Sequence, residues 1–312
     1  MAYGSQHSFW MVPEVTYGTT PTTPAFVSIP VSKFTGGISM TTLIDDTIRG
    51  DRQIVDARGG AITSKFDITT KLRYSAYDSL LAAVLCGAWT QVGSSATYQL
   101  LTGVTYQSFT GERHFADLTD KPYYRQPGTE LSKMSLKCTK DALIDATFSC
   151  VSQTEIDDTA AITGATYGTI PTAVGPFDSF TGSISEGGSS IGIVQDFSLD
   201  IDNNLELKPV VGSRLTLRPA KLLSNVSGTL QVYFETDTLW DKFKASSYSS
   251  LALTLTDPLN NQLVIAIPRI MYTGEANRDV TGPGAVSMSL KFQGLLDSGT
   301  GTNISFTRTP HA

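Results

Sequence analysis

Cysteine and histidine are scarce in this chain of 312 residues, which holds three of each, all far apart. No two cysteines have the close spacing of a disulfide framework or a zinc site. A serine–histidine–aspartate arrangement would depend on His114, and no nucleophile-elbow motif accompanies that residue. We therefore expect no catalytic residues, no metal and no cofactor, and we expect the protein not to be an enzyme.

Long apolar runs are missing as well. The longest, Leu80 to Cys86, is far shorter than the roughly 20 residues that cross a bilayer as a helix. The first residues, Met1 to Gly4, lack the basic and apolar regions of a secretory signal. We expect that the protein does not associate with a membrane. We also expect that it is made in the cytoplasm of a bacterial host.

Charge is also sparse, and positive charge most of all. Charged residues make up 17% of the chain, the net charge is −6, and no basic stripe is visible. Proteins that grip nucleic acid rely on such stripes, because phosphate contacts supply most of their affinity. A mildly acidic surface repels DNA, which suits a conduit better than a clamp.

The residues that are abundant favour strands. Hydrophobic residues make up 40% of the chain, threonine and serine are frequent, and 27 glycines punctuate it. Alternation with a period of two is clearest from Ile62 to Tyr74. Similar patterns predict the strands 34–44, 62–74, 98–101, 108–115, 131–139, 143–152, 180–184, 192–201, 226–234, 251–256, 263–272 and 286–295.

Two short helices interrupt these strands. The first spans 75–87, where Ser75 or Asp78 can cap the start and Gly87 can close the end. The second spans 235–244. Each helix follows a strand, a long polar loop and a second strand. An offset of 159 residues carries Ile38-Ser39-Met40 to Phe197-Ser198-Leu199, and Asp78 to Asp237.

This repeat predicts a mainly β protein with two similar β-sandwich or barrel domains, each with one flanking helix. The expected divisions are an extended arm at 1–30, a first domain at 31–153, a linker at 154–176 and a second domain at 177–312. Prolines keep the arm out of a domain core. Its aromatic residues either pack back on their own domain or lie on a neighbouring subunit.

Several segments together resemble phage tail-tube (major tail) proteins. The residues that carry the resemblance are 51–56, the sheet through Phe66, 77–83, 86–89, 108–115, 201–206 and 211–213. The resemblance implies subunits that pair strands around a ring, and an acidic lumen through which DNA slides without specific binding. It also implies long β-hairpin arms that reach the next ring.

The polar loops 43–60 and 202–222 are the expected arms. Candidate assembly residues in them are Asp45, Asp46, Arg49, Asp51, Arg52, Asp202, Asn203, Asn204, Glu206 and Arg214. Asp45 and Asp46 could instead suggest acid–base chemistry, but adjacent carboxylates on an extended chain point in different directions, and a solvated loop is the favoured reading.

The resemblance implies a structural virion protein that forms the stacked rings of a tail tube. Two domains in each chain favour homotrimeric rings with pseudo-sixfold symmetry, and a homohexamer is the alternative. The tape-measure, tail terminator and distal tail proteins are the expected partners.

Other functions remain open at this point. Another virion part, such as a tail-end hub or a capsid decoration protein, belongs to the same class. A two-domain carbohydrate-binding module would display Trp89 and Trp240 as exposed platforms. A β-rich hydrolase would need a carboxylate pair or triad, and none is evident.

Overall fold

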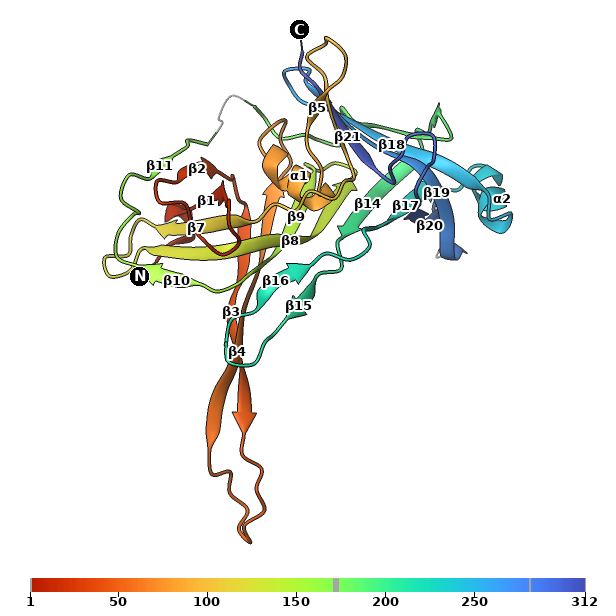
Figure 1. Cartoon of the computed structure of the whole chain (residues 1–312). Coiled ribbons are helices and arrows are strands. Elements are labelled where there is room, and N and C mark those ends of the chain that lie inside the picture. The colour runs from red at the N-terminus through yellow and green to blue at the C-terminus, as the bar shows by residue number, and fades with distance from the viewer. Residues whose placement is uncertain (1, 171–173, 281, 312) are drawn as a thin grey trace.

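A computed structural model describes residues 2–170, 174–280 and 282–311. Strands account for 51% of the chain and helices for 6%, which confirms the expected mainly β fold. The strands of the described residues join into one 19-stranded sheet and a separate two-stranded sheet, and they close no barrel. In Figure 1 the chain starts among the strands on the left, passes through α1 in the middle to α2 on the right, and returns through β18 to β21 toward the top.

Eleven strands and one α-helix form the first half. Their bounds are β1 His7–Pro13, β2 Ala25–Ser28, β3 Lys33–Ile44, β4 Ala57–Lys71, α1 Asp78–Leu85, β5 Thr90–Gln91, β6 Tyr98–Leu101, β7 Phe109–Phe115, β8 Tyr123–Thr139, β9 Asp145–Ser152, β10 Ile156–Asp158 and β11 Thr166–Tyr167. A single 3-10 turn, Gly4–Gln6, precedes β1.

Ten strands and a second helix follow. Their bounds are β12 Ser183–Glu186, β13 Ser189–Ser190, β14 Val194–Asp202, β15 Glu206–Lys208, β16 Leu217–Ala220, β17 Asn225–Tyr233, α2 Thr238–Lys244, β18 Tyr248–Thr256, β19 Gln262–Asp279, β20 Ser287–Gly294 and β21 Ser305–Thr309. Every strand predicted from alternation overlaps one of these strands, and both predicted helices are present.

Strand pairing follows the same order in the two halves. In the first half the neighbours run β3-β4-β9-β8-β7-β1, all antiparallel. In the second half they run β14-β17-β20-β19-β18-β12, again all antiparallel. The helix follows the second strand of the order in each half, so β14, β17 and α2 correspond to β3, β4 and α1.

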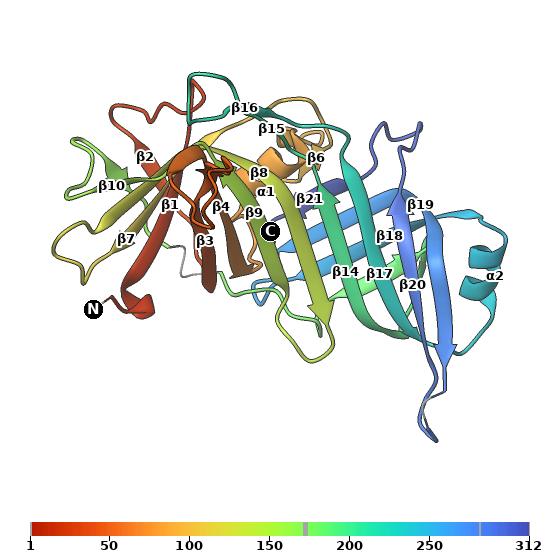
Figure 2. The same cartoon turned by 90° about the horizontal axis from the view of Figure 1, so that it is seen from below.

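The two halves are joined by a strand ladder. Strand β14 pairs with β8 over seven residues, from Asp196 opposite Thr139 to Asp202 opposite Lys133. Figure 2 shows β9, β8, β14, β17 and β20 side by side, so one sheet passes from the first half into the second. Leu136 and Leu199 face each other in this ladder, and both are buried in a core that spans the halves.

The N-terminal segment differs from the extended arm expected at 1–30. Strand β1 pairs with β7 over seven residues, and Phe9 and Met11 are buried. Phe9 packs against Phe34 and Phe66 of the same chain. Alternate apolar residues after position 8 outweigh the prolines, of which Pro13 stands at the end of the strand.

The segment expected as a linker, 154–176, also lies against the first half. Strand β10 pairs with β8, and β11 pairs with β2. Residues 171–173 of this segment lie outside the described residues, as do residues 1, 281 and 312 of the expected arm and second domain.

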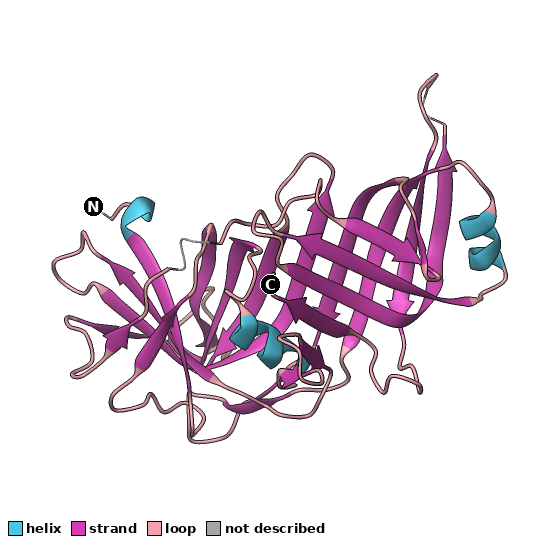
Figure 3. Ribbon diagram, turned by 90° about the horizontal axis from the view of Figure 1, so that it is seen from above, coloured by secondary structure: helices cyan, strands magenta, loops and turns pink. Residues whose placement is uncertain are grey.

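Helix α1, the cyan helix in the middle of Figure 3, differs from its prediction at both ends. Neither Ser75 nor Asp78 caps it through a side chain, and the two bond each other instead. Cys86, with φ of 50°, takes the left-handed position expected of Gly87. Gly87 is required for another reason: a Cβ there would lie 2.1 Å from the carbonyl oxygen of Leu101.

Candidate functional site

A long hairpin projects from the body of the molecule. Strands β3 and β4 continue past the other strands as a two-stranded ribbon, and residues 45–56 form its tip (Figure 1). The ladder is still closed at Ile44 opposite Ala57. Five candidate residues come together at this exposed tip: Asp45, Asp46, Arg49, Asp51 and Arg52.

Interactions at the tip are local. The carboxylate of Asp45 accepts hydrogen bonds from the backbone N–H and hydroxyl of Thr47, which lower its pKa. Arg49 lies 3.3 Å from Asp51. Exposed pairs of this kind add little to stability. Ile48 and Ile54 are 97% and 69% exposed, so the tip offers apolar side chains that this chain does not cover.

The second expected arm, 202–222, is not free. Strands β15 and β16 form a short hairpin that lies beside the base of the first arm (Figure 1). The backbone N–H of Ile62, on β4, donates to the carbonyl oxygen of Arg214 at 2.8 Å. This loop therefore crosses from the second half onto the first and is held against β4.

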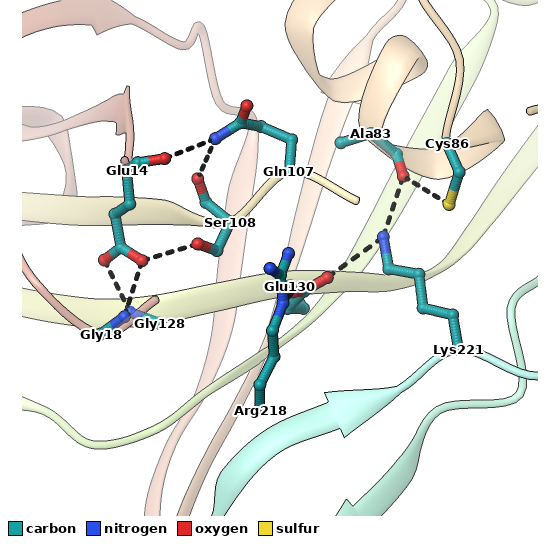
Figure 4. Close-up of polar contacts among 10 residues, drawn as sticks. All are labelled: Glu14, Gly18, Ala83, Cys86, Gln107, Ser108, Gly128, Glu130, Arg218 and Lys221. Carbon is teal, nitrogen blue, oxygen red and sulfur yellow. Dashed lines mark hydrogen bonds and ion pairs between the residues drawn. The ribbon is translucent and has the colours of Figure 1, made fainter. Parts of the chain in front are cut away.

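A buried ion cluster holds the loop (Figure 4). Glu130 of β8 is 1% exposed. Arg218 Nε lies 2.7 Å from one of its carboxylate oxygens, and Lys221 Nζ lies 3.2 Å from the other. Lys221 also donates to the carbonyl oxygen of Ala83 in α1 at 3.1 Å. The side chains of Glu130 and Lys221 are both buried, and each depends on the other because a buried charge is costly unless it is paired, whereas the Arg218 side chain is 40% exposed.

Asn203, a candidate assembly residue, is a second anchor. It is 3% exposed, and its Nδ2 donates to the carbonyl oxygens of Val84 and Leu131 at 2.9 and 3.3 Å. In the single chain Asn203 is therefore an internal anchor, and its role in assembly stays a prediction. The side chains of Asn204, Glu206 and Arg214 are exposed, and Asp202 ends β14.

Glu14 is an interaction centre that the sequence analysis missed. The carboxylate of this buried residue accepts hydrogen bonds from the backbone N–H groups of Gly18 and Gly128 at 2.9 and 2.8 Å. The hydroxyls of Ser108 and Thr110 donate to it at 2.8 Å. Gly18 lies four residues from Glu14, but the other donors come from two distant stretches of the chain, so no local motif marks the whole site. The contacts pin the N-terminal segment to the first half.

One face of the continuous sheet is mainly polar, with Val151, opposite Lys65, as an apolar residue on it. On β4, β9, β8, β14, β17 and β20, residues buried in the core alternate with polar residues on the opposite face. This polar face consists of Lys65, Asp67, Thr69, Lys71, Asp145, Thr147, Ser149, Lys133, Ser135, Lys137, Asp196, Ser198, Asp200, Asp202, Ser227, Thr229, Gln231, Ser289, Lys291 and Gln293.

Charges on the polar face are balanced. It carries five lysines and five aspartates. Lys71 lies 2.6 Å from Asp145, and Lys133 lies 3.1 Å from Asp200 across the β8–β14 ladder. Helix α1 packs on the core side of the sheet, where Leu80 and Val84 are buried, and leaves the polar face uncovered.

Neither of the two tryptophans considered for carbohydrate binding forms an open platform. Trp89 is partly buried, donates to the carbonyl oxygen of Asp78 at 3.0 Å and has the Arg308 guanidinium over its ring. The Trp240 ring is partly buried and covered by Arg278, 4.0 Å from its centroid. Both rings serve packing.

The described residues also bear on metal binding and on membrane insertion. Among them, no three or more histidine, cysteine or acidic side chains group in a way that could hold a metal ion. No helix in the described ranges combines the length and apolar character needed to cross a membrane.

Comparison with known proteins agrees with this architecture. The family model described as phage tail tube protein matches residues 4–294, nearly the whole chain. No curated protein matches the chain. The chain therefore belongs to the phage tail tube protein family, which is structural and not enzymatic, and is a component of the virion tail.

Proposed function

We propose that this chain forms rings that stack into a tail tube, the conduit through which DNA reaches the host. The observation that carries the proposal is the ladder between β8 and β14, which joins two halves of equal strand order into one sheet. Strand pairing that continues around a ring would close such a sheet on itself and cover its edges.

The number of chains in a ring follows from the repeated strand order. With two equivalent halves in each chain, three chains give six similar units, and we propose a homotrimer with pseudo-sixfold symmetry. The division into domains at 31–153 and 177–312 belongs to this proposal. A homohexamer would place twelve units around the ring.

The polar face lines the lumen in this arrangement. It is the side of the sheet that α1 leaves uncovered, and it offers serine, threonine and paired charges. Because Lys71 and Lys133 are each paired with an aspartate, phosphate binding to them is weakened. The lining is thus charge-balanced, where the family resemblance suggested an acidic one, and DNA would pass without specific binding.

The β3–β4 hairpin reaches the adjacent ring, with Ile48 and Ile54 at its tip covered by the neighbouring subunit. The ends of the tube meet the tape-measure, tail terminator and distal tail proteins, and assembly takes place in the host cytoplasm. Self-assembly with other tail proteins is what the family implies.

Negative-stain electron microscopy of the purified protein, with class averages viewed end-on, tests the proposal. We expect rings or tubes with a central hole, and a native mass of three chains in each ring. A mass of six chains would replace the trimer by the hexamer. Single rings that never stack would favour a tail-end hub, and monomers at high concentration would contradict the tube.

A further inference from the structure

Two segments far apart in the sequence meet on the first half: the N-terminal turn, residues 14–18, and the crossing segment, residues 216–221. Gln153 contacts both of them. Gly18, with φ of 74°, packs so closely against this side chain that a Cβ there would lie 2.6 Å from Oε1. On the other segment, Nε2 of Gln153 donates to the carbonyl oxygen of Thr216 at 3.1 Å, and Thr216 is 4% exposed. One side chain therefore joins the two segments.

Tyr17 of the N-terminal turn is a second link. The Arg218 guanidinium of the crossing segment lies over its ring, 5.7 Å from the centroid. Burial raises the pKa of the Tyr17 hydroxyl, and the negative charges of Glu130 and Glu14 raise it further. Both buried carboxylates are thus within electrostatic reach of one phenol. Tyr17 therefore connects the contacts around Glu14 with those around Glu130.

The charges around the two carboxylates are complementary. The four hydrogen bonds that the Glu14 carboxylate accepts come from neutral groups, so its surroundings leave a charge of −1. Glu130 pairs with two cations, Arg218 and Lys221, so this cluster has a charge of +1. Because charges interact more strongly away from water, each group of contacts stabilises the other across Tyr17.

The contact between the two segments is incompletely bonded. Tyr17 Oη and Arg218 Nη2 are buried, and neither has a hydrogen-bond partner within the described residues. A buried polar group without a partner is costly, and it regains hydrogen bonds to water when it is exposed. Opening of this contact therefore costs less than opening of the apolar core, as expected of a region that opens locally.

We propose that the N-terminal turn and the crossing segment open and close together as one unit, here called the strap. When it is closed, the strap holds the second half against the first at a place other than the β8–β14 ladder. Coupling between two sites is reciprocal, so a molecule that displaces either segment also loosens the other. The strap belongs to the single chain and does not depend on the proposed tube.

A cysteine beside the crossing segment reports whether the strap is open. Cys86 is 6% exposed, and its thiol donates to the carbonyl oxygen of Ala83 at 3.7 Å. Lys221 donates to the same oxygen at 3.1 Å, so its side chain lies beside the thiol (Figure 4). Opening of the crossing segment withdraws Lys221 and uncovers Cys86. Cys150 of β9, which is 2% exposed in the core, is uncovered only by global unfolding.

Removal of the Tyr17 ring changes the N-terminal turn and is measured on the other segment. In the full-length chain carrying Tyr17→Ala, iodoacetamide should label Cys86 at least about tenfold faster than in the wild type, as peptide mapping shows. Labelling of Cys150 should change by less than about twofold. Val15→Ala, at a neighbouring position that is 100% exposed, should label like the wild type. Tyr17→Phe keeps the ring over Arg218 and should label no faster than the wild type.

The reverse experiment changes the crossing segment and is measured on the N-terminal turn. Arg218→Met removes the guanidinium that lies over the Tyr17 ring. The backbone N–H of Gly18 should then exchange with deuterium at least about tenfold faster, although Glu14, which accepts its hydrogen bond, is unchanged. Leu217→Ala, at a neighbouring side chain that is 54% exposed, is the matched control and should leave this exchange unchanged.

The outcomes decide whether the segments are coupled. A wild-type rate at either reporter, when the opposite segment is changed, would show two independent segments and overturn the strap. Equal acceleration of Cys86 and Cys150 in Tyr17→Ala would indicate global unfolding and overturn it as well. Tyr17→Phe that labels as fast as Tyr17→Ala would do the same, because the ring would then carry no part of the link.

Discussion

Buried polar side chains hold the irregular segments of this protein at the residue scale. Glu14 ties the N-terminal segment to β7 and β8. Glu130 of β8 holds the 202–222 loop through Arg218 and Lys221, and Lys221 also bonds α1. Each carboxylate is almost fully removed from water and accepts bonds from segments far apart in sequence. Such groups stabilise only as complete sets, since a single unpaired member would be costly.

Substitution of Glu130 measures what the ion cluster contributes. Glu130→Gln keeps the shape but leaves Lys221, whose side chain is 3% exposed, without a counter-charge. We expect a loss of about 3–5 kcal/mol in the free energy of unfolding, measured by urea denaturation. Glu206→Gln, on the exposed side of β15 in the same loop, should change it by less than about 0.5 kcal/mol. Equal effects would show that the cluster does not hold the loop.

His7 predicts a pH dependence of stability. Burial, then the Arg113 guanidinium and His114, lower the pKa of His7 from 6.5 to about 4. Between these values the unfolded chain binds a proton that the folded chain does not, so stability falls as the pH drops from about 6.5 to about 4. After allowance for partial exposure we expect a loss of about 1–2 kcal/mol.

Urea denaturation at pH 7 and pH 4.5 checks this dependence. His7→Gln should lose that share of the pH effect, because its side chain does not titrate. His311→Gln, at an exposed position near the C-terminus, should retain it. An unchanged slope in His7→Gln would show that other groups cause the loss.

The two long loops show how differently related segments behave at the element scale. Both join the first two strands in the pairing order of their half. The first loop extends as a ribbon with an exposed tip, whereas the second folds back because Asn203, Arg218 and Lys221 find partners on the first half. The tip of the first arm has no such partner within the described residues, which suits contact with another ring.

Removal of the arm tip separates folding from stacking. Ile44 and Ala57 already face each other, so Asn-Gly in place of residues 45–56 closes the ribbon with a two-residue turn. We expect the free energy of unfolding to change by less than about 0.5 kcal/mol, because the tip is exposed. Rings should still form and tubes should not, as seen by electron microscopy. Full-length tubes from this variant would remove the arm from the stacking contact.

The two halves have the same order of paired strands and share one sheet, so the whole molecule is a tandem repeat. That sheet has a buried face and a polar face, and the charges of the polar face cancel. The chain's excess of acidic residues therefore lies elsewhere on the surface. In the proposed tube, a lumen lined by this face would resist DNA binding through hydroxyls and paired charges, without strong repulsion.

Added positive charge tests the orientation of the polar face. Ser227→Lys with Ser289→Lys places two unpaired cations on it, and tubes of this variant should retain a short DNA duplex in a salt-dependent way. Ser94→Lys with Ser298→Lys adds the same charge at exposed positions off the polar face. Co-sedimentation at low salt measures the difference. Equal retention by both variants would place the polar face outside the lumen.

Alternation and spacing in the sequence determined much of the fold. The strands from 34–44 to 286–295, both helices, the hairpin with its charged tip and the repeat offset of 159 can all be derived from local patterns, because side-chain period and turn residues are local properties. The resemblance to tail-tube proteins also needed only the residues as written, and the family match confirms it.

Tertiary structure alone decided the rest, because those features depend on contacts between distant segments. Strand β1 joins the first half through β7, and Asn203 is buried as an anchor, although each looked like part of an accessible arm. Only the pairing of β14 with β8 shows that the repeats share one sheet. The same ladder distinguishes the two first strands of the halves: within the described residues β14 has a paired strand on each side, and β3 pairs with β4 alone.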